Sequence, residues 1–350
     1  MDKYFTLTNN DNALLEYNNA LKKAFELINN SYRILITTHI NPDGDALGSA
    51  IALYFYTKDK GKNADIIISD NVPPFLKFLD GSELILKYDN IKDELKERNL
   101  YDIIILLDLN ESSRIGDLIT FVKGSESKKI LIDHHVTHQR NNIETDITVT
   151  QETSSSTGEI IWDLINLDDN YIITSQVASA LYTAIMSDTG SFRFPSTTPK
   201  VFNIASRLVA YGANPSYIYD SYYNINSFRK MKLYGLGLLS LEMHYNNRLC
   251  IMSLAQDDFI KTGAIEDDVE NFVESLLSIE GVKVGILLTD YPGRFEIRIS
   301  FRAKNSYEVR SLAVEFGGGG HMQASGARVK NANLDGLKND IIMKAGKLFL

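Results

Sequence analysis

The sequence predicts an α/β protein: a doubly wound, mostly parallel sheet in an N-terminal domain, and a smaller α/β C-terminal domain across a cleft from it. In residues 1–200, short apolar runs alternate with stretches of helical periodicity, which is typical of a parallel sheet covered by helices. Those runs are continuously apolar, as expected of strands buried on both faces. From Arg248 onward the pattern changes. A chain of 350 residues also favours two domains, and we expect them at 1–200 and 246–350, with a helical linker at 201–245.

The elements of the N-terminal domain follow from local patterns. Helices are expected where apolar residues recur at helical spacing, and strands where apolar residues run together between turn residues. The expected helices are 14–28, 46–56, 158–167, 176–187 and 199–211, and the expected strands are 33–38, 64–69, 102–107 and 129–132.

The C-terminal part mixes strands and helices. A long, tyrosine-rich and largely helical segment at 217–242 is expected to link the domains. The expected strands are 249–254, 283–288 and 294–301, and the expected helices are 267–278, 307–316 and 334–348. Strict alternation in the third strand places Arg298, Ser300 and Arg302 on one face.

Composition narrows the classes of function. The formal net charge of -9 argues against broad binding to duplex DNA, which requires a basic surface. It leaves room for a small phosphate-bearing substrate. The single cysteine, Cys250, excludes an internal disulfide and lies in an apolar run, where we expect it to be buried and inert. No apolar run reaches the roughly 20 residues needed to cross a bilayer, and residues 1–12 lack the pattern of a secretory leader, so we expect a cytoplasmic protein without a membrane partner.

One imidazole and two carboxylates lie close together in the loop after the first expected strand. His39, Asp43 and Asp45 are ligand types for hard divalent cations. The same residues also suit an Asx-turn at Asp43-Gly44, with Asp45 as the cap of the next helix. From this stretch alone, the metal site and the turn with its cap are about equally supported.

Three further groups end predicted elements. Asp108 and Asp133-His134-His135 each follow a buried strand, and Asp188 ends a helix, where the helix dipole disfavours a carboxylate. A lone aspartate at such a point is more often a cap, but adjacent histidines after a buried strand are costly to leave unpaired. His138 lies farther along the loop, and we expect it to be solvated. Because ligands bind at the carboxyl ends of parallel strands, the groups together predict a two-metal site.

Arginines and glycines mark the C-terminal part. Arg298 and Arg302 suit bidentate binding of phosphate, but they suit a solvated strand face equally well. The run Gly317 to Gly320 lets backbone N–H groups approach a ligand, although a flexible turn is the simpler explanation.

The motifs also resemble a known family. His39-x-x-x-Asp43-x-Asp45, Asp108, Asp133-His134-His135 and Asp188 resemble, in this order, the signatures of the DHH phosphoesterase superfamily. The segment 317–326 resembles the glycine-rich motif of the DHH-associated C-terminal domain. Length and layout are most similar to the group that degrades very short RNA and removes a phosphate from 3′-phosphoadenosine 5′-phosphate (pAp).

The resemblance implies a role for each matching residue. His39 and Asp43 would hold a first Mn²⁺, and Asp108 would bridge it to a second, held by Asp45, His134 and Asp188. His135 would contact the scissile phosphate, and Asp133 would support it. The nucleotide would be held in the C-terminal domain, and the residues implied there are Arg298, Ser300, Arg302, Gly318, Gly319, Gly320 and His321.

We therefore expect a hydrolase with two divalent metal ions, acting on short RNA to release mononucleotides and on pAp to release AMP. A phosphodiesterase for cyclic or linear dinucleotides is the nearest alternative, and a non-hydrolytic nucleotide sensor is the alternative from another class. A homodimer stays open.

Overall fold

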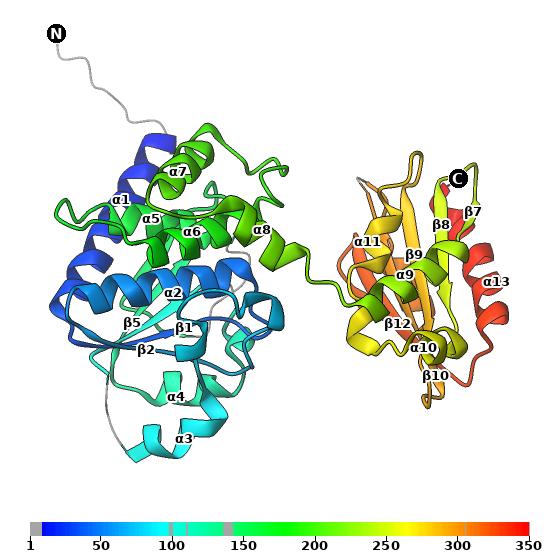
Figure 1. Ribbon diagram of the computed structural model, residues 1–350, viewed down its shortest axis with the longest axis horizontal. Coiled ribbons are helices and arrows are strands. Elements are labelled where there is room, and N and C mark those ends of the chain that lie inside the picture. Colours follow the sequence, from blue (N-terminus) through cyan, green and yellow to red (C-terminus); the bar gives the residue numbers. More distant parts are fainter. Residues whose placement is uncertain (1–8, 98–100, 110, 136–142, 305, 350) are drawn as a thin grey trace, which may run out of the picture. The chain divides into compact units, whose positions relative to one another are not determined.

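A computed structural model describes residues 9–97, 101–109, 111–135, 143–304 and 306–349. The chain divides into two compact units, Met1–Ile225 and Asn226–Leu350 (Figure 1). The expected linker 201–245 is thereby divided between them: α7 (Pro199–Ala210) and α8 (Pro215–Tyr223) lie in the first unit, and α9 (Phe228–Leu239) lies in the second.

The first unit is built on a six-stranded parallel sheet in the order β3-β2-β1-β4-β5-β6, which confirms the predicted fold class. The strands are β1 (Arg33–Thr37), β2 (Asn63–Ile68), β3 (Leu86–Lys87), β4 (Ile103–Leu107), β5 (Lys128–Asp133) and β6 (Ile147–Thr150). The chain runs outward from β1 to β3 and then returns to place β4 on the other side of β1. The crevice at the carboxyl ends of β1 and β4 is therefore the switch point, where open α/β sheets bind ligands.

Helices cover both faces of this sheet (Figure 1). In β1, Ile34 and Ile36 pack in one apolar core and Leu35 packs in the other, so the strand is buried on both sides. One core is shared with α1 (Asn9–Asn30), α2 (Gly44–Asp59), α5 (Thr157–Ile165), α6 (Ser175–Asp188) and α7, and the other with α3 (Tyr88–Glu97) and α4 (Ile119–Gly124). A Cβ on Gly48 of α2 would lie 2.5 Å from the carbonyl oxygen of Ala180 in α6, so these two helices touch backbone to backbone.

The second unit holds a mixed sheet in the order β11-β12-β10-β9-β8-β7. Its strands are β7 (Glu242–His244), β8 (Leu249–Leu254), β9 (Val284–Asp290), β10 (Glu296–Ala303), β11 (Gly319–Gly320) and β12 (Ala324–Lys330). Residues from α12 (Arg310–Glu315) and α13 (Leu334–Ala345) share one core with Ile297, Ile299 and Phe301 of β10. The other core lies against β8 and β9 and is shared with α9, α10 (Gln256–Thr262) and α11 (Phe272–Leu276).

Two predicted helices differ from the structure. The segment 267–278 is not one helix: a 3-10 turn at Glu266–Val269 is separated from α11 by Asn271, whose φ of 69° is left-handed. The segment 217–242 is likewise two helices, because the chain leaves helical geometry between α8 and α9. Short elements such as β3, β6, β7 and β11 were not expected, since two to four residues give no readable periodicity. Among the described residues, no helix is long and apolar enough to cross a membrane.

Candidate metal centre

His39 is held at the carboxyl end of β1 by local hydrogen bonds. The hydroxyl of Thr38 donates to the carbonyl of Leu107 in β4, at 2.9 Å, and ties the two strand ends together. Nδ1 of His39 lies 2.8 Å from the carbonyl oxygen of Ile40, so Nδ1 carries the proton and donates it. Nε2 is thus left with a free lone pair, and it lies 3.3 Å from Oδ2 of Asp108.

Asp43 caps a helix and also lies beside another candidate ligand. It is the N-cap of α2, because its Oδ1 accepts the N–H of Ala46 at 3.0 Å. The same oxygen lies 3.9 Å from Nε2 of His39. The alternative that made Asp45 the cap is wrong, because Asp45 lies within the first turn of α2, fully buried and turned toward α5.

Asp108 follows β4 with a left-handed backbone, at φ 55°. Its N–H donates to the carbonyl of Ile132 at 3.0 Å, which holds this unusual conformation against β5. The buried carboxylate faces three histidines: Oδ2 faces His39, and Oδ1 lies 3.6 Å from Nε2 of His134 and 3.5 Å from Nδ1 of His135. Left-handed non-glycine residues cluster at functional sites, and here the conformation turns a carboxylate into the crevice.

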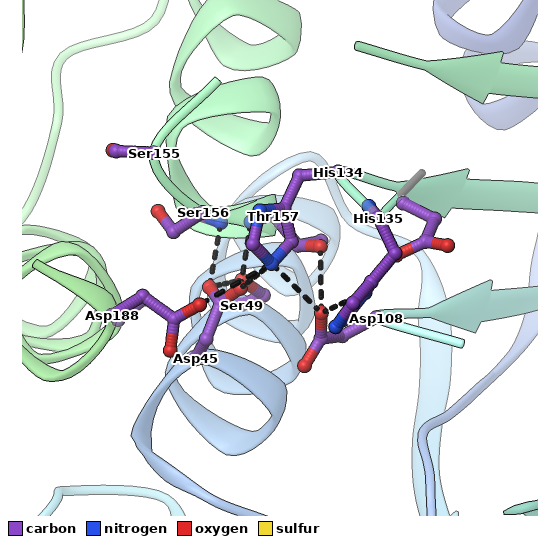
Figure 2. Close-up of polar contacts among 12 residues, drawn as sticks. Asp45, Ser49, Asp108, His134, His135, Ser155, Ser156, Thr157 and Asp188 are labelled. Atoms are coloured by element: carbon purple, nitrogen blue, oxygen red, sulfur yellow. Dashed lines mark hydrogen bonds and ion pairs between the residues drawn. The ribbon is translucent and has the colours of Figure 1, made fainter. Parts of the chain in front are cut away.

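The segment Asp133-His134-His135 lies at the carboxyl end of β5, and the centres of its two imidazole rings are 4.5 Å apart. Oδ1 of Asp133 accepts hydrogen bonds from the backbone N–H of His135 at 3.2 Å and from its Nδ1 at 2.7 Å. Nε2 of His134 lies 3.2 Å from Oδ2 of Asp188 and 3.7 Å from Oδ2 of Asp45 (Figure 2). His138 lies outside the described residues.

The structure thus brings all six predicted ligands into three overlapping groups. In each group the ligand atoms lie within 4.8 Å of one another. The groups are Asp108, His134 and His135; His39, Asp43 and Asp108; and Asp45, His134 and Asp188.

The donor chemistry fits divalent cations. Among the described residues, the buried Nε2 of His134 makes no hydrogen bond of good geometry, although carboxylate oxygens of Asp188, Asp108 and Asp45 lie 3.2, 3.6 and 3.7 Å away. A nitrogen ringed by carboxylates is what a cation site offers. Burial, together with the charges of Asp108 and Asp188, raises the pKa of Asp43, and it raises that of Asp45 well above its usual value. Buried carboxylates in such a cluster require compensating positive charge. Carboxylate oxygens and imidazole nitrogens together suit Mg²⁺, Mn²⁺ or Zn²⁺.

Three further residues, Ser49, Thr157 and Gly158, orient the carboxylate of Asp45. Asp45 accepts the backbone N–H groups of Thr157 and Gly158 and the hydroxyl of Ser49. From the sequence, only a helix at 158–167 is expected here, with no role at the site. No local pattern predicts that the start of α5 lies beside α2 on the same face of the sheet.

In the second unit, a cavity of about 530 Å³ lies over the open face of β10 and β12. Its lining includes Arg298, Ser300 and Arg302 of the predicted set, together with Gly318 and Gly319. The lining does not include Gly320 or His321, whose backbone forms a turn with Ala324. Nε of Arg302 donates to Oε1 of Glu274 at 2.8 Å, so one donor of its guanidinium group is already used.

Cys250 is buried in β8, and burial raises its thiol pKa to about 11. The thiol is therefore protonated at neutral pH, as expected of an inert cysteine.

Two family models match the chain: the DHH family, N-terminal domain, over residues 33–185, and the DHHA1 domain over residues 246–347. The bifunctional oligoribonuclease and PAP phosphatase NrnA of Thermus thermophilus is 32% identical over 306 residues, which is 86% of each chain. The protein of the same name from Bacillus subtilis is 26% identical over 85% of this chain and 89% of its own. A crystal structure of an exopolyphosphatase-related protein from Bacteroides fragilis superposes with a TM-score of 0.83 at 30% identity, covering 95% of this chain and 98% of that one.

Proposed function

The chain belongs to the DHH family, and we propose that it is a two-metal phosphoesterase that hydrolyses very short oligoribonucleotides to mononucleotides and pAp to AMP. The observation that carries the proposal is the carboxylate of Asp108, whose two oxygens face the histidines of two different ligand groups. The name and coverage of the Thermus thermophilus relative support the substrate class.

His39 and Asp43 would hold one ion, and Asp45, His134 and Asp188 would hold the other, with Asp108 shared. Two divalent ions, when bound, activate water and neutralise charge on the phosphate. We propose Mn²⁺ because it accepts both the carboxylate oxygens and the imidazole nitrogens of this set.

His135 is the residue assigned to the substrate. Its Nδ1 is committed to Asp133, which fixes the ring and leaves Nε2 for the phosphate. The hydrogen bond to Asp133 also raises the pKa of His135. Asp133 itself is buried and supports the ring without reaching the substrate.

The second unit would hold the nucleotide. Arg298 and Arg302 offer charge to a terminal phosphate, and Gly319 of the same cavity leaves the backbone accessible. The acidic net charge of -9 and the small size of this basic cluster favour short substrates, since long single strands require an extended basic groove.

A substrate panel tests the proposal. With Mn²⁺ present, we expect the highest kcat/KM on dinucleotide RNA and pAp, and a lower one on cyclic dinucleotides. A higher kcat/KM on cyclic or linear dinucleotide signalling molecules would contradict the proposed substrates and support the alternative phosphodiesterase. Tight nucleotide binding with no release of mononucleotide would instead support the sensor, and would exclude a phosphoesterase.

A further inference from the structure

The first turn of helix α5 contacts Asp45 and Asp108, two of the proposed metal ligands. Its N-cap is Ser156, whose Oγ accepts the N–H of Glu159 at 3.2 Å. The N–H groups of the first helical turn have no partner within their own helix. Those of Thr157 and Gly158 instead donate to the two oxygens of Asp45, at 2.6 and 2.8 Å (Figure 2). Both oxygens of Asp45 are therefore fixed by one helix end.

Thr157 makes a second contact from its side chain. Its Oγ1 donates to Oδ1 of Asp108 at 3.1 Å. Asp45 belongs to the ligand group with His134 and Asp188, whereas Asp108 belongs to the group that includes His39. One residue thus binds, through its backbone and its hydroxyl, a carboxylate from each of two ligand groups, and Thr157, Asp45 and Asp108 are all buried.

The surroundings prevent Thr157 from moving away. Oε2 of the buried Glu159 accepts both the N–H and the hydroxyl of Ser155, at 2.9 and 2.8 Å, which fixes the chain just before the helix. On the other side, a Cβ on Gly158 would lie 2.5 Å from Cβ of Ala184, so α5 rests against α6, the helix that ends in Asp188.

We propose that Thr157 is a positioning residue that fixes Asp45 and Asp108 relative to each other, and so sets the spacing of the two metal-binding groups. The inference rests on the proposed two-metal function. The hydroxyl bond to Oδ1 limits rotation of the Asp108 carboxylate and keeps Oδ2 directed at His39. A β-branched side chain serves this purpose better than a freely rotating one, because its χ1 is restricted.

The test is the Mn²⁺ dependence of Thr157→Val, which removes the hydroxyl and keeps the backbone N–H. Residues that orient metal ligands are worth about 10- to 100-fold in metal affinity or activity, so we expect the Mn²⁺ concentration for half-maximal activity to rise by that factor. The same shift should appear without substrate, in the Mn²⁺ dependence of the melting temperature. Thr157→Ser should restore most of the affinity, and excess Mn²⁺ should restore kcat of Thr157→Val.

The matched control is Thr57→Val, because Thr57 is equally buried but its hydroxyl donates only to the carbonyl of Tyr54 in α2. It should behave as wild type.

If Thr157→Val does not fold, Thr157→Ala gives the same comparison. A wild-type Mn²⁺ dependence in a folded Thr157 variant would overturn the positioning role, as would a wild-type chain whose melting temperature ignores Mn²⁺. If the variants shift the Mn²⁺ dependence of melting while wild type hydrolyses none of the substrates, the proposed function fails and the positioning role stands.

Discussion

Oδ2 of Asp108 lies 3.3 Å from Nε2 of His39, although the two residues are 69 positions apart and follow different strands. The contact exists because β4 pairs directly with β1, so the residues after both strands meet at the switch point of the sheet. When His39 is neutral and donates from Nδ1, neither its Nε2 nor Oδ2 of Asp108 carries a proton, so two lone pairs face each other. A cation bound by both atoms removes this repulsion.

Asp108→Asn tests this relationship directly. The amide keeps the size of the side chain but loses the charge that both ligand groups share. Stabilisation of charge by metal ions is worth several kcal/mol, so we expect kcat/KM to fall by about 10²- to 10³-fold. We also expect the loss to exceed that of His321→Ala, because His321 does not line the cavity of the second unit. Equal losses in the two variants would contradict the metal assignment.

Asp102→Asn is the matched control at the other end of β4. Oδ2 of Asp102 accepts the N–H groups of Tyr32 and Arg33, far from the carboxyl end of the strand. We expect unchanged kcat/KM. A large loss in this variant would mean that the Asp108 effect reflects damage to the strand.

The sequence predicted the strands that carry the site because their apolar runs are long and continuous. The same runs are followed by His39, Asp108 and Asp133-His134-His135, so candidate ligand positions could be inferred without knowledge of strand order. What no pattern revealed was the strand order itself, which brings β4 beside β1 and Asp108 beside His39. Long-range adjacency depends on tertiary packing, which periodicity does not report.

The interpretation of single residues was limited for the same reason. The sequence favoured Asp43 as a turn residue and Asp45 as the cap, but Asp43 caps α2 and the N–H groups of α5 bind Asp45. The break at Asn271 was missed because asparagine tolerates left-handed geometry, and the apolar spacing around it still fits a helix.

Removal of metal should lower stability. Four carboxylates gather at the site, and burial together with the charges of Asp108, Asp188 and Asp43 raises the pKa of Asp45. In the metal-free protein the ionised form of this carboxylate therefore opposes folding. A ligand at about 100 times its Kd stabilises by about 2.7 kcal/mol, so we expect Mn²⁺ to raise the melting temperature by about 5–10 °C over EDTA. Scanning fluorimetry across a Mn²⁺ titration measures this. An identical Tm with and without Mn²⁺ would count against a metal site.

Asp188→Asn should separate stability from function. Asp188 is the last residue of α6, where the helix dipole is unfavourable to a carboxylate. Its charge also opposes ionisation of the neighbouring Asp45. We expect the Tm in EDTA to rise by about 1–3 °C while the gain from Mn²⁺ shrinks. Asp220→Asn, an exposed acid in the last turn of α8, is the control and should keep the full gain from Mn²⁺. A full Mn²⁺ gain in Asp188→Asn would remove this residue from the ligand set.

Two neighbouring glycines of the second unit should respond differently to alanine. A Cβ on Gly318 would lie 2.0 Å from the carbonyl oxygen of Gly326, whereas a Cβ on Gly319 would meet nothing within 4 Å. Gly318→Ala should therefore cost about 1–3 kcal/mol of unfolding free energy. Gly319→Ala should keep wild-type stability but raise KM for pAp, because its methyl group enters the proposed nucleotide cavity. Unchanged KM in Gly319→Ala would place the nucleotide elsewhere.

Arg298 should contribute more to substrate binding than Arg302 of the same strand or Arg294, which precedes the strand. Arg302 already gives its Nε to Glu274, and Arg294 pairs with Glu266 and does not line the cavity. Arg298 lines the cavity with an exposed side chain on the same face as Ser300. Charge-assisted hydrogen bonds are worth about 1.5–3 kcal/mol, so Arg298→Gln should raise KM for pAp by about 10- to 100-fold.

The kinetic pattern distinguishes binding from catalysis in this variant. The phosphate held by Arg298 would be bound equally in the ground and transition states, so kcat should change little while KM rises. Arg298→Lys should recover only part of the loss, because an ammonium cannot reproduce the planar fork of a guanidinium. Arg294→Gln, which removes the same charge outside the cavity, should leave KM near wild type. If Arg294→Gln and Arg298→Gln raise KM equally, the effect is one of net charge, and the cavity over β10 and β12 is not where the nucleotide binds.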